Sequence, residues 1–521
     1  MPAVDEAVLR PLLEKQAARQ PEKVFVRFAD GTQWTYAETL AIAQRTAAAL
    51  QDEGVQPGDR VIAWGPNGPL QLRAWFGTNY LGAVYVPVNT AYRGNLLAHV
   101  IANAGARVMI AEAGLLDRLA GLDTAALQVV FTDGTPPATL RQRPVATLDG
   151  AAEELRLGSP PALWDEYGII YTSGTTGPSK GVLSSYLHLW TTSVLTYGYM
   201  QESDTCLVNL PMFHVGGTTS IFCALTRGAS IALFDGFSAA AFWDQIRATG
   251  ATISSGLIGV MAAFLAKAPP RPDDADNPLR ITNIIPVSDF MLDFAKRFGF
   301  QTFTGFNMTE ISCPLVADLD FKVPGSCGRP RSGVEVRLVD GNDLEVPAGT
   351  VGEMILRADN PWAMSHGYNA MPDATSRAWR NGWFHTGDAF RTDADGNFFF
   401  VDRIKDTIRR RGENVSSMEV EAELLAHPAV LDAAVVAVPA DESEDEIMAV
   451  VAPKPGQTID PADLVRFLAP RLAYFMVPRY VRVLDALPKT PTNKVRKNLF
   501  REAGITPDSW DRVAAGIKLA K

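Results

Sequence analysis

The first ~320 residues alternate between short apolar runs and segments with helical periodicity, and this alternation limits the fold more than any other feature. Strands buried on both faces of a parallel sheet read as continuous apolar runs, and parallel strands need helical crossovers between them. The alternation therefore predicts a largely parallel α/β sheet with helices on its faces. The apolar runs are Val61–Trp64, Val84–Val88, Val108–Ala111, Val129–Thr132, Ile169–Thr172, Leu207–Leu210, Ile231–Phe234 and Asn283–Pro286.

Residues 35–53 show the signals expected of one of the helices. Thr35 and Glu38 have the spacing of a capping box, and Gly54 is a typical C-terminal stop. Between them, apolar residues recur at steps of three and four: Leu40, Ala43, Ala47 and Leu50. The pattern predicts a helix that begins just after Thr35.

The pattern of apolar and turn-forming residues changes at two points along the sequence. From about Gly325, short alternating runs are separated by Gly, Pro, Asn and Asp, which predicts antiparallel strands in a small distorted barrel. After Arg403, helical patterns at Glu419–Ala426 and Pro461–Leu472 mix with strand patterns at Ala433–Pro439 and Met448–Pro453. We predict an N-terminal domain over residues 1–402, a hinge over 403–406 and a C-terminal α+β domain over 407–521.

Composition excludes several classes of protein. A chain of 521 residues with 47% hydrophobic residues can bury more than one core, and a net charge of −10 argues against a nucleic-acid binder. The four cysteines form no CxxC pair, which favours free thiols over a disulfide frame or zinc site. The N-terminus lacks a signal-peptide h-region, and no apolar stretch is long enough to span a membrane. We expect a cytoplasmic protein.

A phosphate-binding loop is predicted at YTSGTTGPSKG, residues 171–181. Glycines let a backbone approach a phosphate, exposed N–H groups and hydroxyls donate to its oxygens, and Lys180 adds a positive charge. The hydroxyl of Thr175 or Thr176 can also help to position Mg²⁺. The alternative of a P-loop NTPase fails, because Ser179 and Gly181 stand where GxxxxGK[ST] needs Gly and Ser or Thr. A loop that binds nothing is the weaker reading, because these residues crowd together directly after a strand.

This loop resembles the nucleotide-binding loop of the adenylate-forming superfamily of AMP-binding enzymes, which includes acyl-CoA synthetases. Further matching segments follow in the family's order: GFNMTE at 305–310, GWFHTGD at 382–388, VDRIKDTIRRRGENV at 401–415 and LPKTPTNKVRK at 487–497. The resemblance covers nearly the whole chain. It implies α/β subdomains rich in parallel strands plus a small β-barrel, followed by a small mobile α+β domain.

The resemblance assigns the nucleotide site residue by residue. Glu310 takes the metal-ligand role with Thr175, while Phe306 lies against the adenine where the family usually has Tyr. Asn307 replaces a usual Gly and narrows the space there. Asp388 matches the acid that binds the ribose. The remaining nucleotide contacts implied by the match are Thr172, Ser173, Gly174, Thr176, Gly177, Lys180, Thr309, Arg403 and Gly412.

Two lysines receive distinct roles from the match. Lys494, presented between prolines and a basic run, corresponds to the family's lysine for adenylation, where a cation can stabilise developing charge. Lys405 falls at the hinge between domains. Taken alone, a lysine near the end of a chain is usually a surface charge, and the Arg409–Arg411 run reads as solvated.

The acyl site is the least determined part of the prediction. His214 in PMFHVGG is expected to contact the substrate, although a core or surface histidine is a serious rival. Asp289 either binds a cationic group of the substrate or caps the following helix. The predicted lining is mostly apolar and favours a hydrophobic or ring-bearing acid: His214, Gly216, Gly256, Leu257, Val287, Phe290 and Met308. PVNTAYRGNLLAHVI at 87–101 is similar to the carnitine/crotonobetaine-CoA ligase branch, which keeps a zwitterionic acid as an alternative.

The resemblance implies an ATP-dependent acyl-CoA ligase that uses Mg²⁺ and coenzyme A, with domain alternation between its half-reactions and a homodimer by analogy. Carboxylate and ATP give acyl-AMP and pyrophosphate, and CoA then gives acyl-CoA and AMP. The alternatives are an adenylation enzyme that loads a carrier-protein thiol and a nucleotide-binding module without catalysis. The sequence ends at Lys521 without a carrier domain, which favours free CoA.

Overall fold

The computed structural model describes residues 1–172, 179–285, 287–403, 408–410, 413–415, 417–439, 445–472, 476–490 and 494–519. The chain forms two compact units. The first is built from the described parts of residues 1–336 together with Leu356–Trp383, and the second from Arg337–Ile355 with the described parts of residues 384–521. The predicted boundary at 402–406 stays a prediction, because residues 404–407 lie outside the described ranges.

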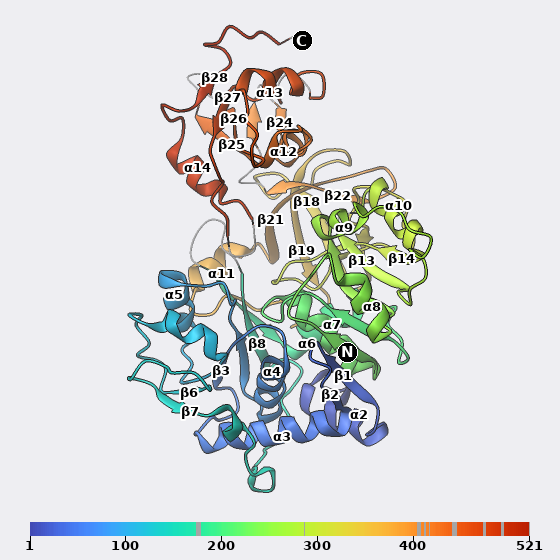
Figure 1. Ribbon diagram of the computed structural model, residues 1–521, viewed down its shortest axis with the longest axis vertical. Helices are drawn as coiled ribbons and strands as arrows, with labels where there is room; N and C mark the ends of the chain where they lie inside the picture. The colour runs from blue at the N-terminus through green and yellow to red at the C-terminus, as the bar shows by residue number, and fades with distance from the viewer. Residues whose placement is uncertain are drawn as a thin grey trace. The chain divides into compact units, whose positions relative to one another are not determined.

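The first unit contains two seven-stranded sheets. One has the order β7-β6-β5-β3-β4-β8-β9, and its neighbours pair in parallel except β8 with β9. Strands β3, β4, β5, β6 and β8 coincide with the first apolar runs, which confirms that part of the prediction, whereas β7 and β9 fall outside them (Figure 1). The bounds are β3 Arg60–Trp64, β4 Val84–Pro87, β5 Val108–Ala111, β6 Val129–Phe131, β7 Arg141–Arg143, β8 Glu166–Tyr171 and β9 Gly181–Ser185.

The second sheet of this unit has the order β14-β13-β12-β10-β11-β1-β2 and is parallel except between β1 and β2. The later apolar runs fall on its strands, as predicted. The bounds are β1 Val24–Phe28, β2 Gln33–Thr35, β10 Thr205–Val208, β11 Ser230–Leu233, β12 Ile253–Ile258, β13 Ile281–Ile285 and β14 Gln301–Phe303.

Helices cover these sheets, and α3 (Tyr36–Asp52) begins where the capping box predicts. Thr35 Oγ1 accepts from the Glu38 N–H at 3.1 Å, and the Thr35 N–H donates to Glu38 Oε2 at 2.7 Å. The other helices of the unit are α1 Val4–Ala7, α2 Leu9–Arg19, α4 Pro69–Leu81, α5 Gly94–Ala104, α6 Tyr186–Thr196, α7 Val215–Arg227, α8 Phe242–Thr249, α9 Gly259–Ala266, α10 Asp289–Phe298 and α11 Pro372–Ala378, with short 3₁₀ turns at Ala113–Leu119, Val145–Leu148 and Ala152–Glu154.

Antiparallel strands follow from Gly305 onward. Strands β15 (Gly305–Phe306), β16 (Leu315–Val316) and β17 (Arg329–Pro330) form a three-stranded sheet. A five-stranded sheet has the order β18-β19-β21-β20, with β22 also pairing with β21, and it is the half-barrel that corresponds to the predicted small barrel. Its bounds are β18 Val334–Val339, β19 Gly352–Ala358, β20 Trp379–Arg380, β21 Trp383–Thr392 and β22 Phe398–Arg403.

The C-terminal part of the second unit is α+β, as predicted. A four-stranded sheet has the order β25-β26-β27-β28, and β23 pairs with β24. The strands are β23 Ile408–Arg410, β24 Glu413–Val415, β25 Val430–Pro439, β26 Asp445–Pro453, β27 Tyr480–Val483 and β28 Trp510–Asp511, and the helices are α12 Ser417–Leu425, α13 Pro461–Leu468 and α14 Lys497–Ala503. Helix α13 ends at Leu468, four residues before the predicted end. Across the described residues, no helix is long and apolar enough to cross a membrane.

Candidate active site

The two ends of the predicted phosphate loop meet at the edge of a sheet. Strand β8 leads into Thr172, whose N–H donates to the Lys180 carbonyl at 3.0 Å, and the Ser179 hydroxyl donates to the Thr172 carbonyl. The loop residues Ser173, Gly174, Thr175, Thr176 and Gly177 lie outside the described residues, so their roles stay predictions. The described ends of the loop, Thr172 and residues 179–180, therefore pair with each other where β8 ends and β9 begins.

Residues 367–369 lie along β9 like a short added strand. Leu183 N–H donates to the Gly367 carbonyl at 3.0 Å, and Asn369 N–H donates to the Gly181 carbonyl at 2.7 Å. The Asn369 side chain accepts from Arg60 at 2.8 Å, which ties this segment to β3. The pairing places Tyr368 beside the end of the phosphate loop.

Tyr368 connects the two charged residues predicted to act on the triphosphate. Its hydroxyl donates to Glu310 Oε1 at 2.9 Å, and Lys180 Nζ lies 4.7 Å from the centre of its ring. Glu310 and Tyr368 are each only 7% exposed. Sequence reasoning found the two charges but missed Tyr368, because nothing in its local sequence marks one tyrosine among 12 as a partner of distant residues.

The surroundings of Glu310 fit a magnesium ion better than a transition metal. Its carboxylate is a hard oxygen donor, and the described residues contain no cluster of three or more His, Cys, Asp or Glu side chains. Magnesium usually takes one or two protein carboxylates, with phosphates and water completing its shell. The Glu310 carbonyl accepts from the Ser365 N–H at 2.9 Å, which holds this residue in place.

The segment before Glu310 explains one departure from the family pattern. Asn307 Oδ1 accepts from the Cys313 N–H at 2.8 Å, so the amide closes the loop over residues 307–313. Phe306 ends β15 and is half-buried, as are Met308 and Thr309. A glycine at 307 would leave the Cys313 N–H without this acceptor.

In the second unit, Asp388 and Arg403 face each other on paired strands. They are partners in the antiparallel register of β21 and β22, and Arg403 Nε lies 2.6 Å from Asp388 Oδ1. Asp388 is fully buried. A buried carboxylate that pairs with a guanidinium can accept hydrogen bonds, in keeping with the ribose role that the sequence predicts.

Lys494 lies in the same electrostatic environment. Burial lowers the pKa of its ammonium group, Arg403 lowers it further, and Asp388 acts in the opposite direction. Thr490 fixes the backbone there, because its N–H donates to the Lys494 carbonyl at 2.7 Å and its Oγ1 accepts from the Lys494 N–H at 3.1 Å. The unit thus brings three sequence-predicted residues, Asp388, Arg403 and Lys494, into one charge cluster. Lys405 and Gly412 lie outside the described residues.

A buried relay of polar groups joins β22 to the helix that follows Lys494. Lys497 Nζ donates to Ser417 Oγ at 2.6 Å and lies 2.7 Å from Glu421 Oε1. Ser417 in turn donates to Asp402 Oδ2 through its N–H at 2.7 Å and its hydroxyl at 2.5 Å. Asp402 precedes Arg403, and Lys497 lies three residues after Lys494 at the start of α14, so these bonds fix the backbone near both Arg403 and Lys494.

Two of the predicted acyl-site residues, Gly216 and Gly256, lie beside Leu210. A Cβ at Gly216 would come within 2.9 Å of Leu210 Cδ1, and one at Gly256 within 3.8 Å of the same atom. Leu257 and Val287 are each 1% exposed, and His214 is half-buried at the N-cap of α7. By contrast, Phe290 is 48% exposed at the start of α10.

Asp289 is exposed in the first turn of α10, where a carboxylate interacts well with the helix dipole. The cap itself is Ser288, whose hydroxyl accepts from the Met291 N–H at 3.4 Å.

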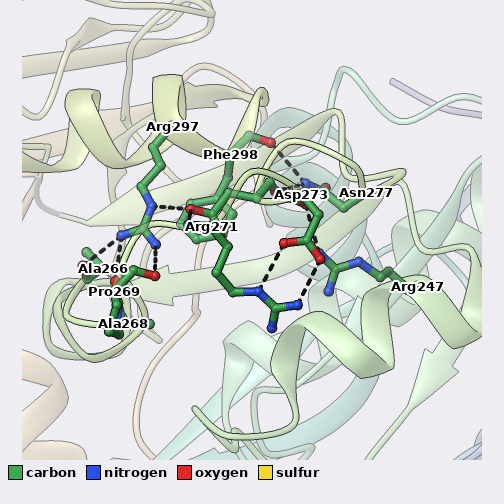
Figure 2. Close-up of polar contacts among 10 residues, drawn as sticks. Arg247, Ala266, Ala268, Pro269, Arg271, Asp273, Asn277, Arg297 and Phe298 are labelled. Atoms are coloured by element: carbon green, nitrogen blue, oxygen red, sulfur yellow. Dashed lines mark hydrogen bonds and ion pairs between the residues drawn. The ribbon is translucent and has the colours of Figure 1, made fainter.

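Arg297 fastens the segment between α9 and β13 to α10. Figure 2 shows its guanidinium reaching the carbonyls of Ala266, Ala268 and Pro269, at 3.1, 2.8 and 3.0 Å. Its Nε also lies 2.7 Å from Asp274 Oδ2. The elements on either side of β13 are therefore fixed to each other.

Comparisons with known proteins agree with this arrangement. The model of the AMP-binding enzyme family matches residues 13–368, and that of the AMP-binding enzyme C-terminal domain matches residues 419–494. The chain belongs to the AMP-binding enzyme family, as its phosphate-loop motif predicts.

Relatives narrow the class. A feruloyl-CoA synthase of Amycolatopsis sp is 33% identical over 94% of this chain and 97% of the relative. A crotonobetaine/carnitine–CoA ligase of Salmonella typhimurium is 30% identical over 90% and 93%. The structure of ATP-bound MatB from Rhodopseudomonas palustris is 27% identical, covers 95% of this chain and 98% of its own, and has a TM-score of 0.79. This chain is an ATP-dependent, AMP-forming acyl-CoA ligase.

Proposed function

We propose that the acid activated by this ligase is hydrophobic and ring-bearing. The predicted acyl-site residues Leu257 and Val287 are buried and apolar, and Leu210 packs against both Gly216 and Gly256. The feruloyl-CoA synthase among the relatives supports the same class by its name. A zwitterionic acid is the second candidate, favoured by the likeness to crotonobetaine/carnitine–CoA ligases.

The Lys180–Tyr368–Glu310 arrangement carries the proposed chemistry of the first step. A carboxylate oxygen of the acid forms a bond to the α-phosphorus of ATP, the bond between the α- and β-phosphates breaks, and pyrophosphate leaves. The carboxylate is already ionised, so no general base is needed, and catalysis consists of orientation and charge stabilisation. Lys180 neutralises phosphate charge, and Lys494 stabilises charge at the reacting centre.

Glu310 would hold Mg²⁺ together with the predicted Thr175 hydroxyl, and the ion when bound supplies positive charge to the triphosphate. Tyr368 holds the Glu310 carboxylate in position through its hydroxyl. Asp388 would accept hydrogen bonds from the ribose, and Arg403 pairs with that carboxylate at 2.6 Å.

In the second step, the CoA thiol sulfur forms a bond to the acyl carbon, the bond from that carbon to the phosphate oxygen of AMP breaks, AMP leaves, and the thiol proton passes to solvent. We propose that the C-terminal domain rotates about Lys405 between the steps, so that Lys494 serves adenylation and the loop of Gly412 serves thioester formation. Such gating is common where two half-reactions share one site. The net charge of −10 and four buried free cysteines support a cytoplasmic enzyme without nucleic-acid partners.

Mass spectrometry of products tests the proposal. The enzyme is incubated with ATP, Mg²⁺, CoA and a mixed panel of aliphatic, aromatic, alicyclic and betaine acids. We expect AMP together with one or a few acyl-CoA masses from ring-bearing acids. Acyl-AMP without a thioester would contradict CoA as the acceptor, and thioesters of betaines alone would contradict the ring-bearing class.

A further inference from the structure

Asn283 lies in the middle of β13, on the sheet face toward α6 and α7. Side chains alternate along a strand, so Asn283 shares its face with Ile281. Its partner in the parallel register is Phe303, and both Ile281 and Phe303 belong to the hydrophobic core that includes residues of α6 and α7. The Asn283 side chain is 6% exposed, so it is almost wholly removed from water.

The carboxamide of Asn283 has no hydrogen-bond partner among the described residues. Its Oδ1 is buried without a partner. Other buried asparagines of the same unit are bonded: Asn209 accepts from Ser255 Oγ at 2.6 Å, and Asn67 donates to the carbonyls of Leu210 and Phe234 at 3.0 Å. A buried amide without partners is costly, and an unsatisfied group of this kind calls for an explanation such as a missing ligand.

Asn283 lies next to Gly256, one of the residues predicted to line the acyl site. Strand β12 has a register irregularity between Ser254 and Leu257, opposite Asn283, and Gly256 sits there at φ +134°. A Cβ at Gly256 would lie 3.9 Å from Asn283 Cβ and 3.8 Å from Leu210 Cδ1, and Leu210 also borders Gly216. Asn209 and Ser255 also lie beside Gly256, but their side chains bond to each other, whereas Asn283 Oδ1 has no partner among the described residues.

We propose that Asn283 is the specificity residue of the acyl site and selects acids that carry a hydroxyl group on the ring. This inference rests on the proposed ring-bearing substrate. A carboxamide offers one acceptor and two donors, and a ring hydroxyl both donates and accepts, so the two match. A quaternary ammonium has no N–H to donate and takes no hydrogen bond from Asn283, and Asp289, the residue considered for reading a substrate cation, is exposed at the start of α10.

The first test measures discrimination with matched acids. Initial rates of AMP release are measured with ATP, Mg²⁺ and CoA for cinnamate and benzoate and for their 2-, 3- and 4-hydroxy derivatives. We expect at least one hydroxylated acid to exceed its parent by about tenfold or more in kcat/KM, because the parent leaves the buried amide unpaired. Parents equal to or better than every hydroxylated partner would overturn the inference.

The Asn283→Leu variant separates a ligand role from a structural one. It replaces the amide with an apolar side chain of similar shape, so the ratio of kcat/KM between the hydroxylated acid and its parent should fall from about tenfold to about one. The melting temperature without substrate should stay the same or rise, because an unpaired buried amide has been removed.

Asn209→Leu serves as the matched control, since Asn209 is bonded to Ser255 and should lose stability on substitution. A fall in melting temperature for Asn283→Leu with unchanged discrimination would assign Asn283 to structure and sink the proposal. Turnover of betaines alone would also overturn it while leaving the ligase activity intact. Failure of every acid to release AMP would count against the proposed substrate as well.

Discussion

The two charged clusters of this ligase are built in different ways. In the first unit, Lys180 and Glu310 both contact Tyr368, one through its ring and the other through its hydroxyl. In the second unit, Asp388 and Arg403 form a direct ion pair at 2.6 Å, and both charges shift the pKa of Lys494. The first cluster interposes a neutral group between opposite charges, whereas the second couples charges directly.

This difference predicts how each cluster responds to change. A tyrosine that holds two partners by separate contacts lets each contact be removed alone, with local effects. Directly coupled charges shift one another, because a charge that is removed changes the electrostatic energy of those that remain. A substitution in the second cluster should therefore affect all of its charged residues. A substitution in the first cluster should affect one contact and leave the other in place.

Loss of Lys494 is expected to have the largest effect. Lys494→Ala should lower ATP–pyrophosphate exchange by a hundredfold or more, because charge stabilisation at a reacting centre is worth that much. Thioester formation from supplied acyl-AMP should stay within a few-fold of the parent enzyme. Lys454→Ala, at an exposed lysine, is the control and should change neither reaction. Equal losses in both half-reactions would contradict the division of roles.

Substitution of Tyr368 tests whether the two contacts of the first cluster are separable. Tyr368→Phe keeps the ring beside Lys180 but removes the hydroxyl that donates to Glu310, and a hydrogen bond to a charged group is worth about 1.5–3 kcal/mol. We expect Mn²⁺ binding, followed by electron paramagnetic resonance in the presence of ATP, to weaken about tenfold or more.

Tyr171→Phe is the control, because the Tyr171 hydroxyl donates to the neutral amide of Asn103 at 2.7 Å. Tyr368→Leu, which also removes the ring, should weaken ATP binding further. Unchanged Mn²⁺ binding in Tyr368→Phe would show that the hydroxyl does not position the carboxylate.

The Arg297 anchor offers a way to perturb the first unit alone. Arg297→Met removes three bonds to carbonyls and the pair with Asp274, so we expect a loss of about 2 kcal/mol in stability. Arg271→Gln removes an ion pair with Asp273 in which the arginine side chain is 71% exposed, and it should cost less than about 0.5 kcal/mol. Calorimetry checks both variants. A lower transition for the second unit as well would show that the units unfold together.

The smallest expected effect is on the titration of Lys494. Competitive labelling with acetic anhydride across pH should place its pKa below the ordinary lysine value of 10.5. Asp388→Asn removes the charge that raises this pKa and should lower it further, whereas Arg403→Gln should raise it. Shifts in the same direction for both variants would contradict direct coupling.

Local signals in the sequence predicted much of the fold. The Thr35–Glu38 capping box marks the start of α3, and each apolar run lies on a strand, because capping and burial depend on neighbouring residues. The motifs also marked Asp388, Arg403 and Lys494, which the structure brings together.

Long-range partners could not be predicted from local patterns. Tyr368 contacts Glu310 across 58 residues, and Asn283 is distinctive only because its buried amide lacks partners. The competing interpretations of Asp289 also needed the structure, since only its exposure beside the Ser288 cap distinguishes them. Such properties arise when distant segments pack, so no spacing along the chain encodes them.

The pairing of residues 367–369 with β9 has a consequence for synthesis of the protein. Strand β9 is the last in its sheet, and among the described residues the segment at 367–369 pairs with its outer edge and also bonds to Arg60 from 309 residues away. At about 5–20 residues per second, a ribosome needs on the order of 10–40 s to make the chain between Ser185, where β9 ends, and Asn369. During that interval the nascent sheet has an open edge that invites pairing with other chains. A growing polypeptide of this ligase should therefore need chaperone protection until residue 369 has emerged.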